Sequence, residues 1–418
     1  MEFKDTKEYA LQLDKDDELA NYRDMFFIPK QKNGKDVIYF AGNSLGLQPK
    51  TAKKYIDQEL KDWADLAVEG HMKAKHPWLP YHEYLTEQTA RLVGGKSVEV
   101  VNMNSLTVNL HLMLVSFYRP ISNRYKILIE SPSFPSDNYA VQSHIKFHGF
   151  EVSNSLIEIS PRNGESYIRT EDIIELIEKN GCDISLILLP GVNYYSGQAF
   201  DIKEITKAGH NSGCVVGFDL AHGIGNLILN LHECDVDFAV WCSYKYLNGG
   251  PGAVAGCYVN EKHTVNNEIP KFLGWWGNDK ATRFLMEKKF KPIPGVESWQ
   301  LSNPPIFQLA ALKASLDIFD EIGMKRLRKK SEVLTSYLEF LIEDKTSNIT
   351  EIITPKDKNH RGCQLSLRFK KNGKEMFNKL LENGVVCDWR EPDAIRIAPV
   401  PLYNSYNDVY KFVEILKH

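Results

Sequence analysis

The sequence predicts an α/β protein whose larger domain is built on a mainly parallel sheet flanked by helices. Between about residues 63 and 290, short apolar runs alternate with helix-like segments, the pattern of strands and crossover helices. The runs lack polar alternation, as expected for strands that are buried on both faces. A chain of 418 residues is also too long for one compact core, so a second domain is expected. The expected strands are residues 125–129, 185–189, 215–218, 238–241 and 253–258.

Three regions are expected to follow one another along the chain. Residues 1–62 should form an N-terminal helical arm and loop that pack with the small domain, residues 63–300 the large α/β domain, and residues 301–418 a small C-terminal α+β domain. The proline-containing segment 290–295 marks the change of region, and residues 303–305 open a long amphipathic helix that continues past Gly323. The remaining elements of the small domain are expected at 362–369, 375–383, 385–388 and 394–399.

Composition argues against several classes of protein. The hydrophobic content of 43% and charged content of 25% are those of an ordinary globular protein. A net charge of −3 provides no basic surface for nucleic acid or a membrane. The seven cysteines include no C-x-x-C pair, which favours a reducing compartment and argues against disulfides or a zinc site. The first residues are charged and no apolar stretch approaches membrane-spanning length, so a cytoplasmic location is expected.

Lys245 is the first candidate for chemistry. It follows the apolar run 238–241, lies between two tyrosines and precedes several glycines, so it should lie just beyond the end of a buried strand. Because desolvation disfavours an ammonium, a lysine in such a place tends towards a neutral, nucleophilic amine. Schiff-base chemistry requires that form. A lysine with a buried stem and a solvated head fits the same residues.

Asp219 is the second candidate, because it ends the apolar run that begins at Cys214 and is followed three positions later by His222. In open α/β sheets, ligands bind beyond the carboxyl ends of the strands, where both Asp219 and Lys245 should lie. A carboxylate for a pyridinium nitrogen and a lysine for an aldehyde carbon are what pyridoxal phosphate requires. Taken singly, Asp219 also fits a helix N-cap and His222 a core histidine.

Two loops are candidates for further cofactor contacts. Residues 102–117 pass from a polar loop into a helix-like run, where Ser105 or Thr107 would cap a helix whose N-terminus attracts anions. Ordinary capping explains this segment equally well. The loop 130–137 contains two prolines and offers Phe134 as a stacking face and Asp137 as a second acid, although a plain turn has the same residues.

These residues belong to a set of motifs that resembles the kynureninase family. The motifs follow in family order over almost the whole chain, and the last three make the resemblance specific. They are NSLGLQPK (43–50), ESPSFPSD (130–137), GFDLAHGIGN (217–226), CSYKYLNGGPG (242–252), GWWG (274–277), SNPP (302–305) and IRIAPVPLYNSYNDVYKF (395–412).

The family comprises fold-type-I pyridoxal-phosphate enzymes of the class-V aminotransferase group, so the resemblance implies both a fold and a reaction. The implied reaction is hydrolytic cleavage of the Cβ–Cγ bond of L-kynurenine and 3-hydroxy-L-kynurenine. Its products are anthranilate, or the 3-hydroxy form, and L-alanine, in tryptophan catabolism and NAD biosynthesis.

The resemblance also implies roles for individual residues. Lys245 would form the Schiff base, Asp219 would pair with the pyridine nitrogen assisted by Asp137, and Arg396 would bind the substrate α-carboxylate. Trp275 and Asn303 would reach the cofactor phosphate from the other subunit of a homodimer. The remaining implied cofactor contacts are Leu106, Thr107, Phe134, Pro135, Ser136, His222 and Tyr244, and the remaining substrate contacts are Ser44, His71 and Asn303.

From the chemistry of the reaction, Tyr244 is our candidate for handling protons at the hydrated carbonyl and at Cβ, since nearby cationic groups could lower the pKa of its phenol. Lys245, once freed as an amine, would take the substrate α-proton. Pro190 departs from the family, since many relatives carry a small hydroxyl residue there, and proline offers neither a hydroxyl nor an N–H to the phosphate. His71, Ser302 and Asn303 could accommodate a ring hydroxyl, so both substrates are expected to be accepted.

Two alternative functions remain open at this point. Another class-V enzyme, such as a cysteine desulfurase or an aminotransferase, would share the lysine and the aspartate. A desulfurase also needs a reactive cysteine on a mobile loop, for which Cys363 is the candidate, although its neighbours fit the start of a buried strand better. A non-catalytic protein that kept the fold is the second alternative, against which the intact Lys245, Asp219 and Arg396 argue.

Overall fold

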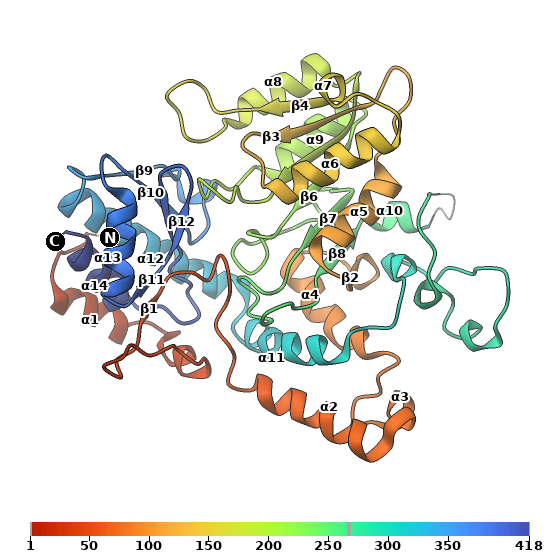
Figure 1. The fold of residues 1–418 in the computed structure, drawn as a ribbon, viewed down its shortest axis with the longest axis horizontal. Coiled ribbons are helices and arrows are strands. Elements are labelled where there is room, and N and C mark those ends of the chain that lie inside the picture. Colours follow the sequence, from red (N-terminus) through yellow and green to blue (C-terminus); the bar gives the residue numbers. More distant parts are fainter. Residues whose placement is uncertain (1, 266–268, 418) are drawn as a thin grey trace.

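The computed structural model describes residues 2–265 and 269–417, which form a large sheet-centred region and a smaller region beside it. Figure 1 shows that the C-terminal elements and the first helix gather on one side of the large sheet, with both chain ends on that side. The fold is the predicted α/β arrangement with a smaller α+β part.

The large region is built on a seven-stranded sheet with the order β2-β8-β7-β6-β5-β3-β4. The strands β3 to β7 of this sheet pair in parallel, whereas β8 is antiparallel to both β7 and β2. The bounds are β2 (Val100–Asn102), β3 (Lys126–Glu130), β4 (Leu156–Ile159), β5 (Ile184–Pro190), β6 (Val215–Asp219), β7 (Phe238–Trp241) and β8 (Gly256–Val259). The strand expected at 253–258 begins at Gly256 instead of residue 253. The backbone N–H of Ala255 donates a hydrogen bond to the carbonyl oxygen of Asn104, which lies in a loop.

The apolar runs have no polar alternation because both faces of the sheet are covered. In β7, Phe238 and Val240 pack into the cluster on one face, while Ala239 and Trp241 pack into the cluster on the other. Since successive strand residues point to opposite faces, every position of such a strand must be apolar.

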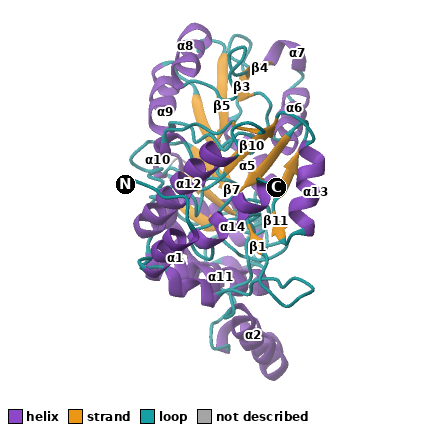
Figure 2. Cartoon of the chain, turned by 90° about the vertical axis from the view of Figure 1, so that its left-hand side faces the viewer, coloured by secondary structure: helices purple, strands orange, loops and turns teal. Residues whose placement is uncertain are grey.

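Helices from different parts of the chain cover the two faces (Figure 2). The helices α5 (Leu106–Phe117), α6 (Pro135–Phe147) and α7 (Val152–Ser155) pack on one face, and α8 (Thr170–Asn180) and α9 (Ile202–Asn211) on the other. The remaining helices of this part are α2 (Ala52–Leu66), α3 (Gly70–Lys73), α4 (Thr86–Val93), α10 (Glu261–Thr264) and α11 (Ile306–Ile322).

The smaller region contains a four-stranded antiparallel sheet with the order β12-β13-β10-β9. Its strands are β9 (Thr350–Ile352), β10 (Leu365–Phe369), β12 (Asp388–Arg390) and β13 (Ala394–Ile397), and its helices are α12 (Met324–Lys345), α13 (Gly373–Glu382) and α14 (Tyr406–Leu416). The N-terminal arm joins this region, because α1 (Lys7–Lys15) packs against α14 and β1 (Ile38–Tyr39) pairs with β11 (Val385–Val386).

The proposed division into domains at residues 62/63 and 300/301 stays a prediction. The buried side chains of α11, such as Leu309 and Leu316, belong to the same cluster as the large sheet, whereas Leu334 and Leu338 of α12 belong to the cluster of the small region. The chain therefore passes from one core to the other close to Gly323, where the backbone adopts a positive φ of 77°.

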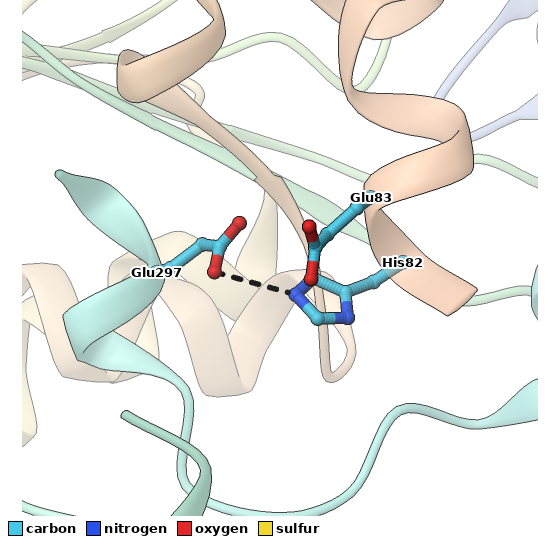
Figure 3. A group of neighbouring side chains, drawn as sticks. All are labelled: His82, Glu83 and Glu297. Carbon is cyan, nitrogen blue, oxygen red and sulfur yellow. Dashed lines mark ion pairs between the residues drawn. The ribbon is translucent and has the colours of Figure 1, made fainter. Parts of the chain in front are cut away.

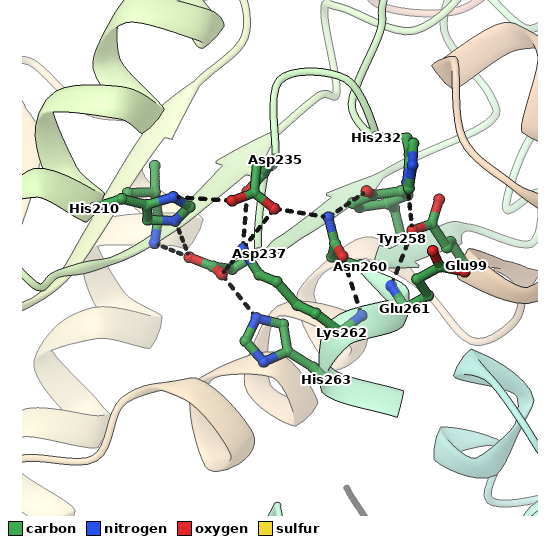
Figure 4. Close-up of polar contacts among 11 residues, drawn as sticks. Glu99, His210, His232, Asp235, Asp237, Tyr258, Asn260, Glu261, Lys262 and His263 are labelled. Atoms are coloured by element: carbon green, nitrogen blue, oxygen red, sulfur yellow. Dashed lines mark hydrogen bonds and ion pairs between the residues drawn. The ribbon is translucent and has the colours of Figure 1, made fainter. Parts of the chain in front are cut away.

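Asp237 is the centre of a polar network at the amino end of β7, on the opposite edge of the sheet from the strand ends discussed below (Figure 4). Its buried carboxylate accepts hydrogen bonds from the backbone N–H of Val216 at 2.7 Å, from His210 Nε2 at 2.8 Å and from His263 Nε2 at 2.7 Å. Lys262 Nζ lies 3.0 Å away. Burial alone would raise the pKa of Asp237, but these donors lower it well below its usual range.

Candidate functional site

A cavity opens at the carboxyl ends of three neighbouring parallel strands, β3, β5 and β6. Strand ends that lie side by side bring their last residues to one edge of the sheet, which is where α/β proteins bind ligands. Glu130, Pro190 and Asp219 are those last residues. The complete lining is Leu106, Thr107, Glu130, Phe134, Ser136, Asp137, Pro190, Val192, Tyr194, Asp219, Ala221, His222, Tyr244 and Lys245.

Lys245 lies four residues beyond the end of β7, in the cavity wall where the sequence predicted it. Its Nζ is 3.0 Å from Nε2 of His222 and 5.9 Å from the centroid of the Phe134 ring. Burial first, and then the charge of Lys245, lower the pKa of His222 well below its usual range. The neutral imidazole can therefore accept a hydrogen bond from Lys245 through Nε2.

The Lys245 loop is held against the N-terminal loop by a close backbone approach. The N–H of Gly46 donates to the carbonyl oxygen of Tyr244 at 2.8 Å. A Cβ on Gly46 would lie 2.3 Å from the carbonyl oxygen of Lys245, so only glycine fits at this position.

Asp219 and Asp137 form a buried pair of acids beside Lys245. Burial first, and then the charge of Asp219, raise the pKa of Asp137 well above its usual value. Burial also raises the pKa of Asp219, but its carboxylate accepts the N–H of Ala221 at 2.6 Å and faces Lys245, which oppose the rise. The negative charge of the pair therefore rests on Asp219, and Asp137 is the protonated partner.

The N-termini of α5 and α6 meet at the cavity, although the sequence predicted a helix start for only the first of them. Thr107 is in the first turn of α5 and Ser136 in the first turn of α6, and their hydroxyl oxygens are 2.9 Å apart. Both helix ends present backbone N–H groups and positive dipoles to the same region. Ser105 is the N-cap residue of α5, but its side chain makes no capping hydrogen bond.

Phe134 offers an aromatic surface at the mouth of the cavity, with Pro135 following it as the first residue of α6. The ring of Phe134 meets that of Tyr194 edge to face, with centroids 5.3 Å apart, and is 43% exposed. Since an exposed aromatic face next to a cavity can stack on a flat ring, this arrangement fits the expected role of Phe134.

Arg396 lies behind the cavity on β13 and is almost completely buried at 1% exposure. Its guanidinium donates to the carbonyl oxygen of Tyr194 at 2.8 Å and to Oγ of Ser44 at 3.0 Å, and it forms an ion pair with Asp388. Ser44 in turn donates a hydrogen bond to Asp388. The Nε donor of Arg396 is buried without a partner, which leaves one side of the fork available to a carboxylate.

The expected low pKa of Tyr244 is wrong. Burial first, and then the neighbouring Cys242, raise the pKa of its phenol far above the usual value. Lys245 Nζ lies 6.0 Å from the centroid of the Tyr244 ring, too far to offset the loss of solvent. Tyr244 is therefore a phenol that keeps its proton at neutral pH.

Trp275, Asn303 and His71 do not line the cavity within one chain. Trp275 is 43% exposed and donates from Nε1 to the carbonyl oxygen of Arg283 at 3.1 Å. Asn303 is exposed just before α11, and His71 on α3 packs against Trp78 with ring centroids 5.4 Å apart. The exposure of Trp275 and Asn303 is compatible with a role in another subunit's site, which stays a prediction.

Three side chains at the site were missed at the level of sequence. Glu130 and Tyr194 line the cavity, and Asp388 holds Arg396. Glu130 could have been found from the same signal as Asp219, because each is the acid that ends an apolar strand. Tyr194 and Asp388 carry no such local signal, since the folding of distant segments brings them to the site.

A second cluster of potential metal ligands lies outside the cavity (Figure 3). Within the described residues, His82, Glu83 and Glu297 are the group whose ligand atoms all lie within 4.8 Å of one another. Lys280 Nζ is 2.9 Å from both Glu83 Oε1 and Glu297 Oε2. Because this ammonium already compensates the two carboxylates, the cluster is an ion-pair network that joins the segment around Lys280 to the residues before α4.

Cys363 does not have the environment of a desulfurase nucleophile. It is 1% exposed and lies two residues before the buried strand β10, as its neighbours predicted. Burial raises the pKa of its thiol to about 12, so the thiolate needed for nucleophilic attack is scarce at neutral pH.

The described part of the chain contains no helix with the length and apolar character needed to cross a bilayer.

Curated relatives match this chain over nearly its full length. Proteins named kynureninase are 58% identical in Koribacter versatilis, covering 99% of this chain and 97% of the relative, and 57% identical in Myxococcus xanthus with the same coverage. The mouse protein of that name is 48% identical over 97% of this chain and 92% of its own. Residues 327–416 match the family model described as the kynureninase C-terminal domain.

Solved structures with low sequence identity share the fold. A cysteine desulfurase from Escherichia coli superimposes with a TM-score of 0.77 at 16% identity, covering 95% of this chain and 96% of that one. A cysteine desulfurase from Thermococcus onnurineus has a TM-score of 0.74 at 18% identity, covering 91% and 94%. A variant of the cystine C–S lyase C-DES, with glycine covalently linked to its PLP cofactor, has a TM-score of 0.76 at 16% identity, covering 91% and 96%.

Proposed function

The chain belongs to the kynureninase family, and we propose that it cleaves the Cβ–Cγ bond of L-kynurenine hydrolytically to give anthranilate and L-alanine. The observation that carries this proposal is the meeting of Lys245, Asp219 and the two helix N-termini at one cavity, with Arg396 behind it. These are the groups that an amino-acid substrate and a phosphorylated pyridine cofactor together require.

The described residues fit pyridoxal phosphate. Asp137 Oδ1 and His222 Nδ1 are buried without hydrogen-bond partners, although both residues line the cavity. We infer that Thr107 and Ser136 hold the phosphate with Leu106, that Phe134 and Pro135 bound the ring, and that Asp219 faces the pyridine nitrogen. When bound, this cofactor supplies an aldehyde for Lys245 and an electron sink for the substrate carbanion.

The substrate α-carboxylate would bind to Arg396, whose position is fixed by Ser44, Asp388 and the carbonyl oxygen of Tyr194. Lys245, as a free amine, would take the proton from the substrate Cα and hold it as an ammonium, which the neutral His222 would orient by accepting a hydrogen bond. Tyr244 would give its proton to Cβ as the carbon–carbon bond breaks, and the resulting phenolate would take a hydroxyl proton from the hydrated γ-carbonyl as that group becomes the carboxyl of anthranilate. Its raised pKa suits a group that holds its proton until the carbon–carbon bond breaks.

Pro190 lines the cavity beside Asp219. The two residues are paired in register, Pro190 at the end of β5 and Asp219 at the end of β6. Because it provides no N–H and no hydroxyl, we propose that phosphate binding in this chain relies on the two helix N-termini without a contribution from this position. His71, Ser302 and Asn303 would accommodate a ring hydroxyl, so we propose that 3-hydroxy-L-kynurenine is a second substrate.

We propose further that the active unit is a cytoplasmic homodimer with shared sites, in which Trp275 and Asn303 reach the partner's cofactor. The exposed Trp275 and its exposed neighbours Phe272 and Leu273, at 58% each, support a contact surface in this segment. The free cysteines of the described chain support a reducing compartment.

Borohydride reduction of the pyridoxal-phosphate-loaded enzyme, followed by digestion and peptide mass measurement, tests the cofactor assignment. The tag should appear on Lys245 and vanish in Lys245→Ala. Lys271→Ala is the matched control, because burial lowers the pKa of Lys271 to about 8 but this residue lies outside the cavity. A tag on another lysine would overturn the assignment, and failure to form anthranilate and alanine from L-kynurenine would overturn the reaction.

A further inference from the structure

Glu130 is a third acid in the cavity, and neither the family motifs nor the proposed chemistry gives it a role. It is the last residue of β3 and is only 4% exposed, yet it lines the cavity together with Asp219 and Lys245. The strand order β6-β5-β3 places Pro190, with no side-chain donor, between Asp219 and Glu130. Glu130 therefore lies at the same edge of the sheet as Asp219, two strands away.

The carboxyl of Glu130 has no counter-charge. Among the described residues, no other side chain or backbone group forms a hydrogen bond with it, and its own backbone N–H is its sole donor. The only ammonium in the cavity lining, that of Lys245, is in contact with His222. A buried carboxylate with no cation and no second donor is costly, so the group avoids ionisation.

The charged groups that act on Glu130 from the neighbouring strands favour its protonated form. They are Asp219 on β6 and Glu158 on β4, and both are negative. Asp137 on α6 and Tyr194 after β5 also face Glu130, but burial raises the pKa of each and keeps it uncharged. His222 is neutral and Lys245 faces Asp219. Burial first, and then the charges of Asp219 and Glu158, raise the pKa of Glu130 to about 8.

We propose that Glu130 is kept as a neutral carboxylic acid in the loaded pocket, so that Asp219 alone carries negative charge against the cofactor. This inference rests on the proposed function, because it concerns the same cavity. Glu130 is then a positioning residue, since the single charge on Asp219 favours one protonation state of the pyridine nitrogen. Its O–H also offers the cavity a hydrogen-bond donor on the β3 side, where the main chain at Pro190 offers none.

The proposal predicts a proton linked to cofactor binding. Pyridoxal phosphate is an anion and it meets Asp219, so a second negative charge on Glu130 would oppose its binding. The loaded state therefore raises the pKa of Glu130 above its value in the empty cavity, and affinity falls as pH rises above about 8. For one linked proton, the dissociation constant rises about tenfold between pH 7 and pH 9.

Equilibrium dialysis of the loaded enzyme against graded pyridoxal phosphate, at pH 7 and pH 9, tests this. Glutamine mimics the neutral acid, so Glu130→Gln should remove the contribution of Glu130 and reduce the pH 9 to pH 7 ratio of dissociation constants about tenfold relative to wild type. The cofactor and the other ionisable groups of the cavity are the same in both proteins, so their contributions cancel in this comparison. Glu130→Asp, which keeps an ionisable group, should retain the pH dependence.

The proposal would be overturned if the ratio of dissociation constants at pH 9 and pH 7 were the same in Glu130→Gln as in wild type. It would also be overturned if Glu130→Gln bound the cofactor at pH 7 as weakly as wild type does at pH 9. The carboxyl infrared spectrum of the wild-type enzyme gives an independent readout if the variant does not fold. In the cofactor-free enzyme, the protonated-carboxyl absorbance should decrease between pH 7 and pH 9 as Glu130 ionises, whereas in the loaded enzyme it should persist to higher pH, and a cofactor-free enzyme with no such decrease would contradict the proposal. The borohydride experiment distinguishes this outcome from a failure of the proposed function. If the proposed function were wrong, borohydride would leave Lys245 of the wild-type enzyme without a cofactor tag.

Discussion

At the scale of single residues, the chemistry depends on how burial distributes protons among a few neighbouring groups. Lys245 faces a neutral His222, and the acid pair keeps its charge on Asp219 because Asp137 is the more strongly neutralised partner. The same loss of solvent keeps the phenol of Tyr244 protonated. Asp219 and Tyr244 thus start in the protonation states that their proposed roles need.

Tyr244→Phe should lower kcat by about 10²–10⁴-fold, the usual contribution of a general acid, while the cofactor remains bound. The hydroxyl is the only group removed, and the ring continues to line the cavity. Steady-state turnover of L-kynurenine and the absorbance of the bound cofactor check the two parts. Wild-type turnover in the variant would remove the tyrosine from the proton-transfer steps.

Arg396→Lys should raise KM for L-kynurenine about tenfold or more, because a lysine cannot form the bidentate pair worth about 1.5–3 kcal/mol. The control is Arg368→Lys on the adjacent strand β10, where the guanidinium pairs with Asp393 at a half-exposed position away from the cavity. Equal effects of the two substitutions on KM would show that Arg396 does not bind the α-carboxylate.

At the scale of elements, the carboxyl ends of the parallel strands carry the candidate site and their amino ends carry a structural network. The chain enters β7 at Asp237, whose carboxylate links β6 through Val216, α9 through His210 and α10 through His263. At the other end of the same strand the backbone continues to Tyr244 and Lys245. The network thus anchors the strand that leads to the loop of Tyr244 and Lys245.

Asp237→Asn should destabilise the protein by about 3 kcal/mol at pH 7, the usual cost of breaking a buried, hydrogen-bonded ion pair. The folded-state pKa of Asp237 lies below the unfolded value of about 3.9, so its stabilisation is complete above that value and is lost as pH falls. Urea unfolding of variant and wild type at pH 7 and near pH 3 should therefore give a larger difference at pH 7.

Asp172→Asn is the matched control for that experiment. The carboxylate of Asp172 also has a lowered pKa, because it accepts hydrogen bonds from Arg162, but the pair lies at the surface. Surface pairs contribute little, so this substitution should change the free energy of unfolding far less than Asp237→Asn does. An equal loss in both variants would contradict a special role for the buried network.

At the scale of the whole molecule, two residues with a proposed role at the cofactor, Trp275 and Asn303, lie outside the cavity of their own chain. Trp275 and Asn303 are exposed, while the phosphate end of the cavity is bounded by Thr107 and Ser136 of the same chain. The simplest arrangement that uses all four residues is a two-fold dimer, in which each chain completes the other's site.

Subunit complementation tests this arrangement. Lys245→Ala and Trp275→Ala chains, each weakly active alone, should regain activity when unfolded together and refolded, because the mixed dimer has one site with both residues intact. Random pairing gives about a quarter of wild-type activity, since half of the dimers are mixed and each has one working site. No recovery, with mixed dimers demonstrated by mass, would mean that Trp275 serves its own chain.

Much of the fold and the centre of the site could be predicted from local patterns. The apolar runs ending at Asp219 and Trp241 identified buried parallel strands, and the positions just beyond them identified the edge of the sheet that binds ligands. The α/β architecture and the membership of the family are confirmed. The pKa of Tyr244 could not be read correctly, because it depends on solvent removed by distant segments and on its packing beside Cys242.

The sequence by itself determined where the buried parallel strands run, that a helix begins near Ser105 and which lysine follows the end of a strand, because periodicity, caps and strand ends are local properties of the chain. Only the tertiary structure decided that Glu130 has no counter-charge, that Asp388 holds Arg396 and that Lys280 neutralises the His82 cluster. Those properties depend on charges and burial contributed by segments far apart in the chain, and electrostatic energy in a protein follows distance and solvent access in space.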